Sequence, residues 1–524
     1  MKEIRELKLS ELSVKQKLGM AMCAHTYECG KLEDSDANID FVIDMIRDHA
    51  LGAVWVSPFY RRDEIMARIK EAADYPILIV TDAEGGFEPH RIGMHGALGR
   101  TGNLQQAYTF GKLTAVHARE MGYNVVCNPV VDINGGVRSI GTDPEQVATI
   151  AVEEAKGMRD GGVLVCAKHF PGGRRTRNID SHMAEPTSLE TAESLVDYAL
   201  KPYIALAKNG VLDAVMAGHC KYPNIDEVYP TSLSKKVCDV LRDQGFDGFI
   251  ITDALIMMGT AAKFGSSEGK GLAINATNLA LTWSYNPDSY QALVDTYEKG
   301  LITDDNLDAA VQYVLDAQHK VLELQTDATI TEEDEQIYTC INRDGVYAKL
   351  DEGLDASISR DGRHYFVVLT ESNVEINDQG KVDVDTQPKG WYQPSVIMDR
   401  LIELFPNSTA VAINQFPSPA QNMNVLERSV GYDDVIFITF VITQAYVGPD
   451  VLTSRVLAVI EALQITDRVS TVVHFGNPKA LEDLVHIPRI LAGGPSAESI
   501  NCTLDVLAGL YPAKGRLTQE IHFN

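Results

Sequence analysis

Short apolar runs alternate with amphipathic stretches over the first 325 residues of the chain. The amphipathic stretches, such as "DEIMARIKEAADY" and "SLVDYALKPYIALAKNG", repeat their apolar residues at helical spacing. The runs between them are almost continuously apolar, which is typical of parallel strands buried on both faces. We predict strands at residues 18–25, 52–57, 76–82, 124–132, 162–169, 213–219, 248–253 and 276–283. Eight such units predict a (β/α)8 barrel, and a doubly wound open sheet is the alternative.

A second alternating pattern follows an acidic and polar stretch at residues 326–360. We predict strands at residues 365–369, 409–413, 434–442, 470–476 and 488–493. Five parallel strands with intervening helices predict an open three-layer α/β sandwich. The expected organisation is a barrel catalytic domain at 1–325, a linker with a helical segment at 326–360, and a C-terminal α/β sandwich domain at 361–524. Within the sandwich, residues 377–391 are predicted to form a surface loop.

The excess of acidic over basic residues argues against nucleic acids and anionic membranes as partners of this chain. The chain has 524 residues, with 46 Lys and Arg against 73 Asp and Glu, and so a formal net charge of −27. Nucleic-acid binders need clustered basic residues, and anionic membranes attract them as well, so we expect neither partner. No apolar run approaches the roughly 20 residues that span a bilayer.

The cysteines and the N-terminus both favour a cytoplasmic protein. The eight cysteines are scattered, without CxxC pairs, and several lie inside apolar strands. Buried free thiols in a reducing compartment are the expected arrangement, and there is no zinc pattern. The first residues, "MKEIRELKLSELSVKQKLGMAMCAH", are charged throughout and contain no apolar core of a signal peptide.

Polar side chains collect where the predicted barrel strands end. They are His25, Asp82, Asp132, Lys168, His169, His219 and Asp253. Barrel enzymes carry their active sites at this carboxyl-terminal face. An individual aspartate at a strand end is equally suited to cap the next helix. The whole set at one end indicates a site.

The motifs that contain these residues resemble those of family 3 glycoside hydrolases. "VTDAEGG" (80–86), "NVVCNPVVDIN" (124–134), "RSIGTDPEQVA" (138–148), "KHFPGG…DSH" (168–182) and "IITDALIMMG" (250–259) follow the family's order. "FGNPKAL…PRILAGGPSAES…LAGLYPAKGRL" resembles its C-terminal sandwich domain. The resemblance is greatest to the two-domain β-N-acetylglucosaminidase branch. It runs nearly end to end.

This resemblance implies three catalytic residues. Retaining hydrolysis needs a carboxylate beneath the anomeric carbon and an acid/base beside the leaving oxygen. Asp253 matches the family's nucleophile, and His182 matches the histidine acid/base of that branch. Asp180 would orient the His182 ring and stabilise its charged form. The competing interpretations are a helix-capping Asp253 and an ordinary surface pair of Asp180 with His182.

The same resemblance implies the substrate-binding residues. They are Asp82, Arg91, Arg138, Lys168, His169 and His219. Lysine and arginine donate hydrogen bonds to sugar oxygens, whereas a carboxylate accepts them from hydroxyl groups. For His219, a buried position at the barrel end is equally expected. Met257 and Met258 are predicted to be wall or core, and Trp283 either stacks on a sugar or anchors the core. No metal or organic cofactor is implied.

Two departures from the family pattern bear on sugar preference. The branch usually has His-Gly after "KHFPG", where this chain has Gly173-Arg174-Arg175 and a loop that looks one residue longer. It usually has Arg after "EGG", where this chain has Phe87, and the later Arg is displaced by one position to Arg91. The extra arginines either recognise a carboxylate or phosphate on the substrate, or form a solvated loop face.

The leading hypothesis is a cytoplasmic retaining exo-β-N-acetylglucosaminidase acting on short amino-sugar oligosaccharides or cell-wall fragments. A β-glycoside phosphorylase is the second hypothesis, because a neutral histidine would not repel an incoming phosphate. A β-glucosidase with an acid/base from the second domain is the third, and a sugar-binding protein without turnover is the non-enzyme alternative. The expected partner is a carbohydrate, a β-linked amino sugar or glucoside, and the oligomeric states considered include a homodimer.

Overall fold

The computed structural model describes residues 4–26, 32–133, 135–176, 179–283, 285–324, 326–370, 373–376, 382–385, 393–441 and 451–522. The chain packs into two compact units. The first comprises Met1–His90, Ala107–Asn134 and Pro144–Glu335. The second comprises Arg91–Gln106, Gly135–Asp143 and Gln336–Asn524.

The first unit is built on a closed ring of parallel strands. They are β1 (Met22–His25), β2 (Ala53–Trp55), β3 (Leu78–Thr81), β4 (Val125–Val126), β5 (Leu164–Phe170), β6 (Ala214–Ala217), β7 (Phe249–Thr252) and β8 (Ala280–Thr282). Each strand pairs with its neighbour in sequence, and β8 also pairs with β1. A parallel bridge between Ile251 and Leu279 closes the ring between β7 and β8. The barrel prediction is confirmed, and the open-sheet alternative is excluded.

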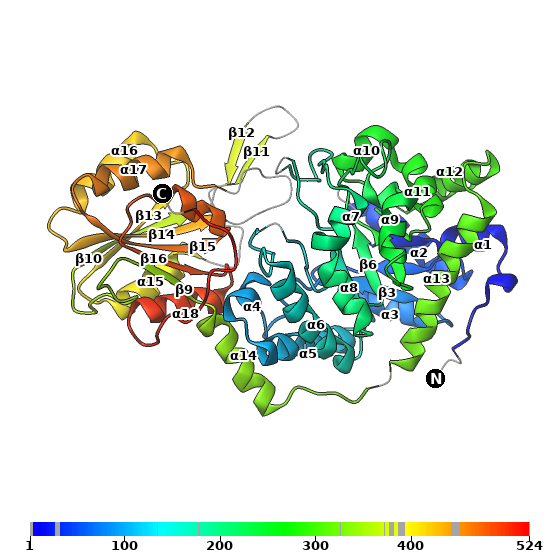
Figure 1. Ribbon diagram of the computed structural model, residues 1–524, viewed down its shortest axis with the longest axis horizontal. Coiled ribbons are helices and arrows are strands. Elements are labelled where there is room, and N and C mark those ends of the chain that lie inside the picture. The colour runs from blue at the N-terminus through cyan, green and yellow to red at the C-terminus, as the bar shows by residue number, and fades with distance from the viewer. Residues whose placement is uncertain are drawn as a thin grey trace. The chain divides into compact units, whose positions relative to one another are not determined.

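Helices surround these strands (Figure 1). They are α1 (Val14–Met20), α2 (Leu32–Arg47), α3 (Arg62–Ala72), α5 (Leu104–Glu120), α6 (Pro144–Gly161), α8 (Lys201–Lys208), α9 (Lys235–Arg242), α11 (Ser266–Asn275), α12 (Pro287–Glu298) and α13 (Asp304–Glu323). The short helices α7 (Ala192–Ser194) and α10 (Met258–Phe264) lie in the connections that follow β5 and β7. Side chains from the strands, among them Cys23, Val80, Met216 and Ile251, fill the interior of the ring. The carboxyl ends of the strands are thereby held at one face of a packed barrel.

The predicted barrel strands are longer than the observed ones, most of all the first, the fourth and the eighth, of which only Ala280–Thr282 is a strand. The first strand was expected to begin at residue 18, but residues 18–20 are the last of α1. Ser13 and Gln16 form a capping box that starts this helix, and a Cβ at Gly19 would lie 1.9 Å from the Ala50 carbonyl oxygen. A short buried apolar run does not distinguish a helix end from a strand. The fourth strand keeps only two of its predicted residues, because the Asn128 N–H donates back to the Val126 carbonyl at 2.9 Å and not to a neighbouring strand, and Pro129 then has no N–H to donate.

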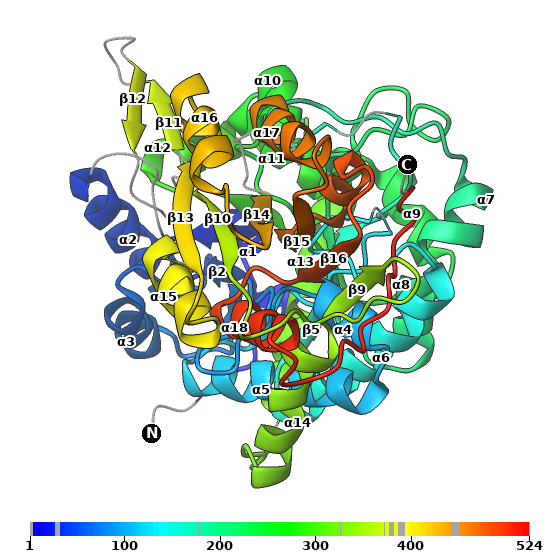
Figure 2. The same ribbon diagram turned by 90° about the vertical axis from the view of Figure 1, so that its left-hand side faces the viewer.

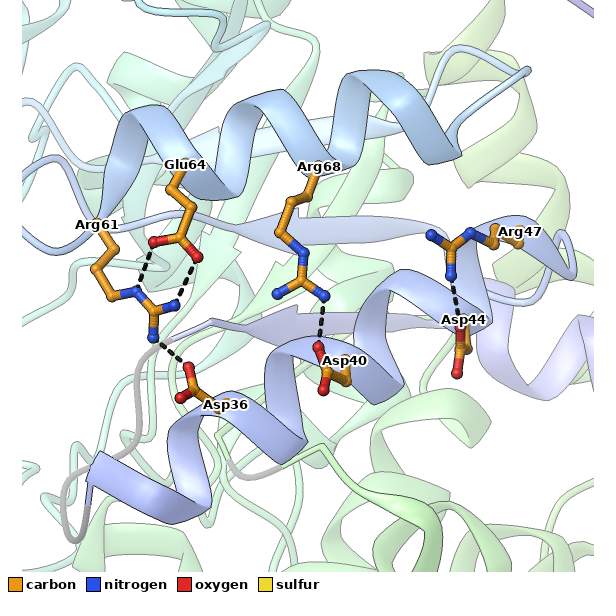
Figure 3. Close-up of polar contacts among 7 residues, drawn as sticks. All are labelled: Asp36, Asp40, Asp44, Arg47, Arg61, Glu64 and Arg68. Atoms are coloured by element: carbon orange, nitrogen blue, oxygen red, sulfur yellow. Dashed lines mark hydrogen bonds and ion pairs between the residues drawn. The ribbon is translucent and has the colours of Figure 1, made fainter.

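Two ion pairs, Arg61–Asp36 and Arg68–Asp40, join α3 to α2 on the barrel exterior, and two further pairs are local to one helix each (Figure 3). Aspartates recur at every fourth residue along α2, so they share one face of the helix. The pairs drawn are Arg61–Asp36, Arg61–Glu64, Arg68–Asp40 and Arg47–Asp44. Exposed ion pairs typically contribute ~1 kcal/mol or less each and weaken in salt. These contacts therefore add modestly to the stability of the barrel wall, and they take no part in the polar cluster at the strand ends.

The second unit is a three-layer sandwich. Its sheet contains β9 (Tyr347–Leu350), β10 (His364–Thr370), β13 (Thr409–Asn414), β14 (Asp434–Val441), β15 (Val469–Gly476) and β16 (Arg489–Gly493), in the order β13-β10-β14-β15-β16-β9. All neighbours are parallel except β9, which runs antiparallel to β16. Helices α16 (Pro419–Arg428) and α17 (Ser454–Gln464) cover one face, and α15 (Pro394–Leu404) and α18 (Ala497–Leu507) cover the other (Figures 1 and 2). The predicted α/β sandwich is confirmed.

Three elements fall in segments expected to be irregular or helical. The segment 326–360 contains α14 (Glu332–Asp344) and also the edge strand β9. Strands β11 (Asn373–Ile376) and β12 (Val382–Asp385) pair as an antiparallel hairpin, so part of the predicted surface loop 377–391 is a strand. The rest of that loop lies outside the described residues. These strands have four residues each, the shortest run in which a period-2 pattern can be recognised; Val-Asp-Val-Asp in β12 does alternate, whereas Tyr-Ala-Lys-Leu in β9 does not.

Candidate active site

Lys168, near the carboxyl end of β5, is the buried centre of a cluster of charges. Its side chain is 1% exposed and forms ion pairs with Asp82 and Glu84, the latter at 2.6 Å between Nζ and Oε1. Both carboxylates follow β3, so Lys168 reaches across the position of β4. Asp82 is 48% exposed and remains accessible to a ligand. Glu84 was not among the predicted site residues.

His169 is oriented by Asp132, which the sequence placed in the strand-end set but to which no catalytic or binding role was assigned. Asp132, which follows β4, accepts a hydrogen bond from the backbone N–H of His169 at 3.2 Å. The other oxygen of Asp132 lies 2.7 Å from Nδ1 of the ring. Because an ionised carboxylate only accepts, Nδ1 donates, and this fixes the tautomer of a neutral His169. Asp132 is buried, so its role is to hold the histidine.

Asp180 and His182 form the predicted pair in the long connection after β5. Oδ1 of Asp180 accepts a hydrogen bond from the backbone N–H of His182 at 2.9 Å and lies 2.7 Å from Nδ1 of the ring. Nδ1 therefore donates, so in the neutral ring Nε2 is the nitrogen that carries no proton. Both side chains are partly exposed, so the ring can reach a bound ligand.

The connection that carries this pair is docked on the segment after β7. The N–H of Met258 donates to the His182 carbonyl at 3.2 Å, and the N–H of Gly259 donates to the Ser181 carbonyl at 3.0 Å. A Cβ at Gly259 would lie 2.8 Å from the Ser181 oxygen, so only glycine fits this approach. These backbone bonds bring the connection with His182 to the segment that begins at Asp253.

Asp253 follows β7 and is held in its ionised form. Its Oδ1 accepts a hydrogen bond from the Ala254 N–H at 2.8 Å. Burial by itself would raise the pKa of this carboxyl, but His219, His169 and Lys168, together with the Ala254 N–H, outweigh burial and lower the pKa. An ionised carboxylate near a basic cluster has the chemistry of a nucleophile at an electron-poor carbon.

His219 is buried, and both of its ring nitrogens are engaged within the barrel. Nδ1 lies 2.8 Å from the Ser232 hydroxyl, and Nε2 lies 3.0 Å from the Ala254 carbonyl oxygen. A carbonyl only accepts, so Nε2 donates. Burial lowers the pKa of His219, which favours the neutral ring. His219 thus contacts the backbone of the residue after Asp253, and its predicted contact with a sugar stays a prediction.

The two predicted arginines belong to the second compact unit. Arg91 and Arg138 lie in the segments 91–106 and 135–143 that pack with that unit. The Arg91 carbonyl accepts a hydrogen bond from the Tyr338 hydroxyl at 2.8 Å. Their predicted contacts with a substrate stay predictions.

The departures from the family pattern have local explanations. Phe87 is buried and stacks on Tyr123, with ring centroids 6.3 Å apart. The Arg174 guanidinium lies 3.9 Å from the centre of the Tyr198 ring, and its backbone N–H donates to Glu190 at 2.7 Å. Phe87 is therefore a core residue, and Arg174 is accounted for without an anion on the substrate.

The apolar residues singled out from the sequence, Met257, Met258 and Trp283, differ in how far they are buried. Met257 is buried, as predicted, whereas Met258 is half exposed. Trp283 stacks on His25 with ring centroids 4.1 Å apart and remains partly exposed. One face of the indole is thus covered by the protein.

Among the described residues, no helix combines the length and apolar character needed to cross a bilayer.

Comparisons with known proteins agree with this architecture. A β-hexosaminidase from Tolumonas auensis is 33% identical over 236 residues, which cover 42% of this chain and 70% of that protein. The solved structure of a glycoside hydrolase family 3 β-N-acetylglucosaminidase from Paenibacillus sp. str. FPU-7 superposes with a TM-score of 0.80 at 23% identity, covering 98% of this chain and 100% of that one. A β-glucoside phosphorylase superposes with a TM-score of 0.77 at 22% identity, covering 98% and 95%. At these identities the structural likenesses concern the fold.

The sequence profile of the glycosyl hydrolase family 3 N-terminal domain matches residues 30–317, which include barrel strands β2 to β8 and most of the polar cluster described above. This match covers more than half of the chain. The chain therefore belongs to glycosyl hydrolase family 3.

Proposed function

We propose that the protein is a retaining exo-β-N-acetylglucosaminidase that removes terminal β-linked N-acetylglucosamine from oligosaccharides or cell-wall fragments. The observation that supports this most directly is the Asp180–His182 pair, docked by two backbone hydrogen bonds on the segment that follows Asp253. The relatives named β-hexosaminidase and β-N-acetylglucosaminidase support the choice of sugar.

In the first step, a carboxylate oxygen of Asp253 attacks the anomeric carbon as the bond to the leaving oxygen breaks. Protonated His182 gives its Nε2 proton to that oxygen, and Asp180 stabilises the charged ring beforehand. In the second step, neutral His182 takes a proton from water. The water oxygen bonds to the anomeric carbon and releases the Asp253 carboxylate, so the configuration is retained.

The remaining polar groups would hold the sugar. Lys168 donates and Asp82 accepts, so the pair suits vicinal hydroxyl groups, and Glu84 keeps the lysine in place. His169, oriented by Asp132, offers Nε2 to a further hydroxyl. Arg91 and Arg138 remain proposed contacts of the substrate.

We assign His219 a positioning role in place of the predicted sugar contact. Its hydrogen bond to the Ala254 carbonyl orients the peptide group that follows the nucleophile. The N–H of Ala254 in turn holds one oxygen of Asp253. This arrangement leaves the other oxygen of the carboxylate for attack.

Domain organisation and cellular setting complete the proposal. The barrel at residues 1–325 would be the catalytic domain, joined by 326–360 to the sandwich domain at 361–524. Six of the described cysteines are buried free thiols, which suits a reducing cytoplasm. Sedimentation equilibrium would test whether the chain forms a homodimer.

Trapping of the intermediate tests the proposal. The acetamido group occupies C2, so a 5-fluoro N-acetylglucosaminide with a good leaving group is the suitable reagent to slow both steps. We expect peptide mapping to find the sugar on Asp253. A label on Asp82 or Asp132, or a first product of inverted configuration, would overturn the assignment. A higher kcat/KM for the aryl glucoside than for the N-acetylglucosaminide would reject the sugar, and sugar 1-phosphate formed in phosphate buffer would indicate a phosphorylase.

A further inference from the structure

The two segments that meet beside the proposed acid/base lack charge in a strongly acidic protein. Charged residues make up 23% of the chain, and the net charge is −27. Yet residues 181–184 and 254–262 contain a single ionisable side chain, that of His182. Charged residues adjoin both segments, with Asp180 and Glu185 next to the first and Asp253 and Lys263 next to the second, so the lack of charge is confined to these two short segments.

Three large apolar side chains on these segments point away from the core. Met183, Ile256 and Met258 are 55%, 48% and 50% exposed, whereas Leu255 and Met257 between them are buried. We call the three exposed residues the apolar rim. Exposed apolar residues are common singly, but three on adjoining segments next to a site form a candidate contact surface.

The backbone presents the apolar rim in a defined position. The N–H of Leu255 donates to the Leu281 carbonyl at 3.1 Å, and the N–H of Met257 donates to the Ala254 carbonyl at 3.0 Å. The N–H of Met258 donates to the carbonyl of His182, and Met183 is the next residue along the chain. The apolar rim therefore adjoins the acid/base from both segments.

The chemistry of cleavage determines what must lie there. The group that protonates the leaving oxygen stands within hydrogen-bond reach of it, so the aglycone departs past His182. We propose that the apolar rim is the leaving-group site and that it selects an uncharged aglycone with a broad apolar face. This inference rests on the proposed function. Flexible, polarisable methionine side chains suit such a surface because they adapt to flat apolar groups.

The test compares two leaving groups of similar acidity but different apolar area. Phenyl and 2-naphthyl β-N-acetylglucosaminides meet this requirement, and the readout is the ratio of their kcat/KM values. We expect the wild-type enzyme to prefer the naphthyl compound by about 10-fold, the order of discrimination that an apolar contact supplies. Met258→Ser and Met183→Ser should each reduce this ratio several-fold.

A matched control is Leu301→Ser. Leu301 is 55% exposed and follows α12 in the turn before α13, so it lies at the opposite end of the barrel from the site. This variant should keep the wild-type ratio. Far-ultraviolet circular dichroism would check that each variant is folded.

Three outcomes would overturn the inference. They are equal kcat/KM values for both compounds in the wild-type enzyme, equal losses for both in Met258→Ser, and a reduced ratio in the Leu301→Ser control. Each of these leaves the proposed function intact, because turnover of N-acetylglucosaminides would already have been seen. Absence of turnover of either compound would instead reject the proposed function and this inference together.

Discussion

Replacing Lys168 by Met removes the buried charge at the centre of the site while keeping a side chain of similar length. The ammonium group is 1% exposed and lies 2.6 Å from an oxygen of Glu84, with Asp82 as its second partner. The variant leaves both carboxylates without their cation. It therefore tests whether these ion pairs contribute to the free energy of unfolding of the barrel.

The expected loss follows from the exposure of the two carboxylates. Removing one partner of a buried ion pair destabilises a protein by about 3–5 kcal/mol, because an uncompensated charge remains. Asp82 is 48% exposed and can be hydrated, whereas Glu84 is only 14% exposed. One carboxylate rather than two is thus stranded, and we expect the free energy of unfolding of the barrel to fall by about 3 kcal/mol.

Urea unfolding followed by tryptophan fluorescence measures this loss, since Trp55 and Trp283 both lie in the barrel unit. The matched control is Lys201→Met. Lys201 pairs with Glu145 at 2.7 Å, but the two side chains are 38% and 71% exposed. An exposed pair of this kind contributes ~1 kcal/mol or less.

Combining Lys168→Met with Glu84→Gln should recover part of the stability, because the stranded charge is then removed. A double-mutant cycle gives the coupling between the two residues. A loss no larger than that of Lys201→Met would refute the reasoning. Failure of Glu84→Gln to recover stability would show that the cost lies elsewhere, for example in packing of the aliphatic stem.

Three further predictions concern histidines. His182→Ala should slow the glycosylation step by about 10²–10⁴-fold for aglycones that are poor leaving groups and far less for acidic phenols. Single-turnover rates across a series of leaving groups measure this difference, and equal losses for all of them would contradict the prediction. His219→Ala should lower kcat about 10²-fold with little change in KM, because the Ala254 carbonyl loses the hydrogen bond that orients the peptide group after Asp253. His219→Gln should restore part of kcat, and a loss that appears mainly in KM, or no recovery by glutamine, would count against the positioning role. In the sandwich unit, burial alone would lower the pKa of His364, but its hydrogen bonds, chiefly to Asp434, raise it. The stability that His364 contributes is thus complete below the unfolded pKa of about 6.5 and is lost as the pH rises through the folded pKa. The difference in the free energy of unfolding between wild type and His364→Gln, measured in urea, should therefore shrink from pH 6 to pH 9. A difference that widens over this range would contradict the argument.

The order of elements in both units could be predicted from the sequence because parallel βα units leave a strong local pattern. Strands buried on both faces are continuously apolar, and the intervening helices repeat at 3.6 residues. Element ends were less predictable. Leu18 fits a strand and a buried helix end equally well, and only the capping box before it favours the helix. Edge strand β9 has half-exposed side chains and so lacks an apolar run.

The chemical groups of the site were also visible in the sequence, since charged residues at the ends of apolar strands are conspicuous. Asp253, His182, Lys168 and His169 were predicted as site residues in this way and through the family resemblance. What they contact was not visible. Asp132 and Glu84 belong to quoted motifs, but their pairing with His169 and Lys168 joins different strands.

The tertiary structure alone decides these pairings, because a hydrogen bond or ion pair depends on which strands are neighbours and on how far each side chain is buried. His219 illustrates this best. Its sequence context at a strand end suits a sugar contact, yet burial and two internal hydrogen bonds direct it to the backbone beside Asp253. The sequence by itself determined the barrel, the sandwich and the types of group at the strand ends. Packing determined which of these groups are buried, which remain exposed and which pair with one another.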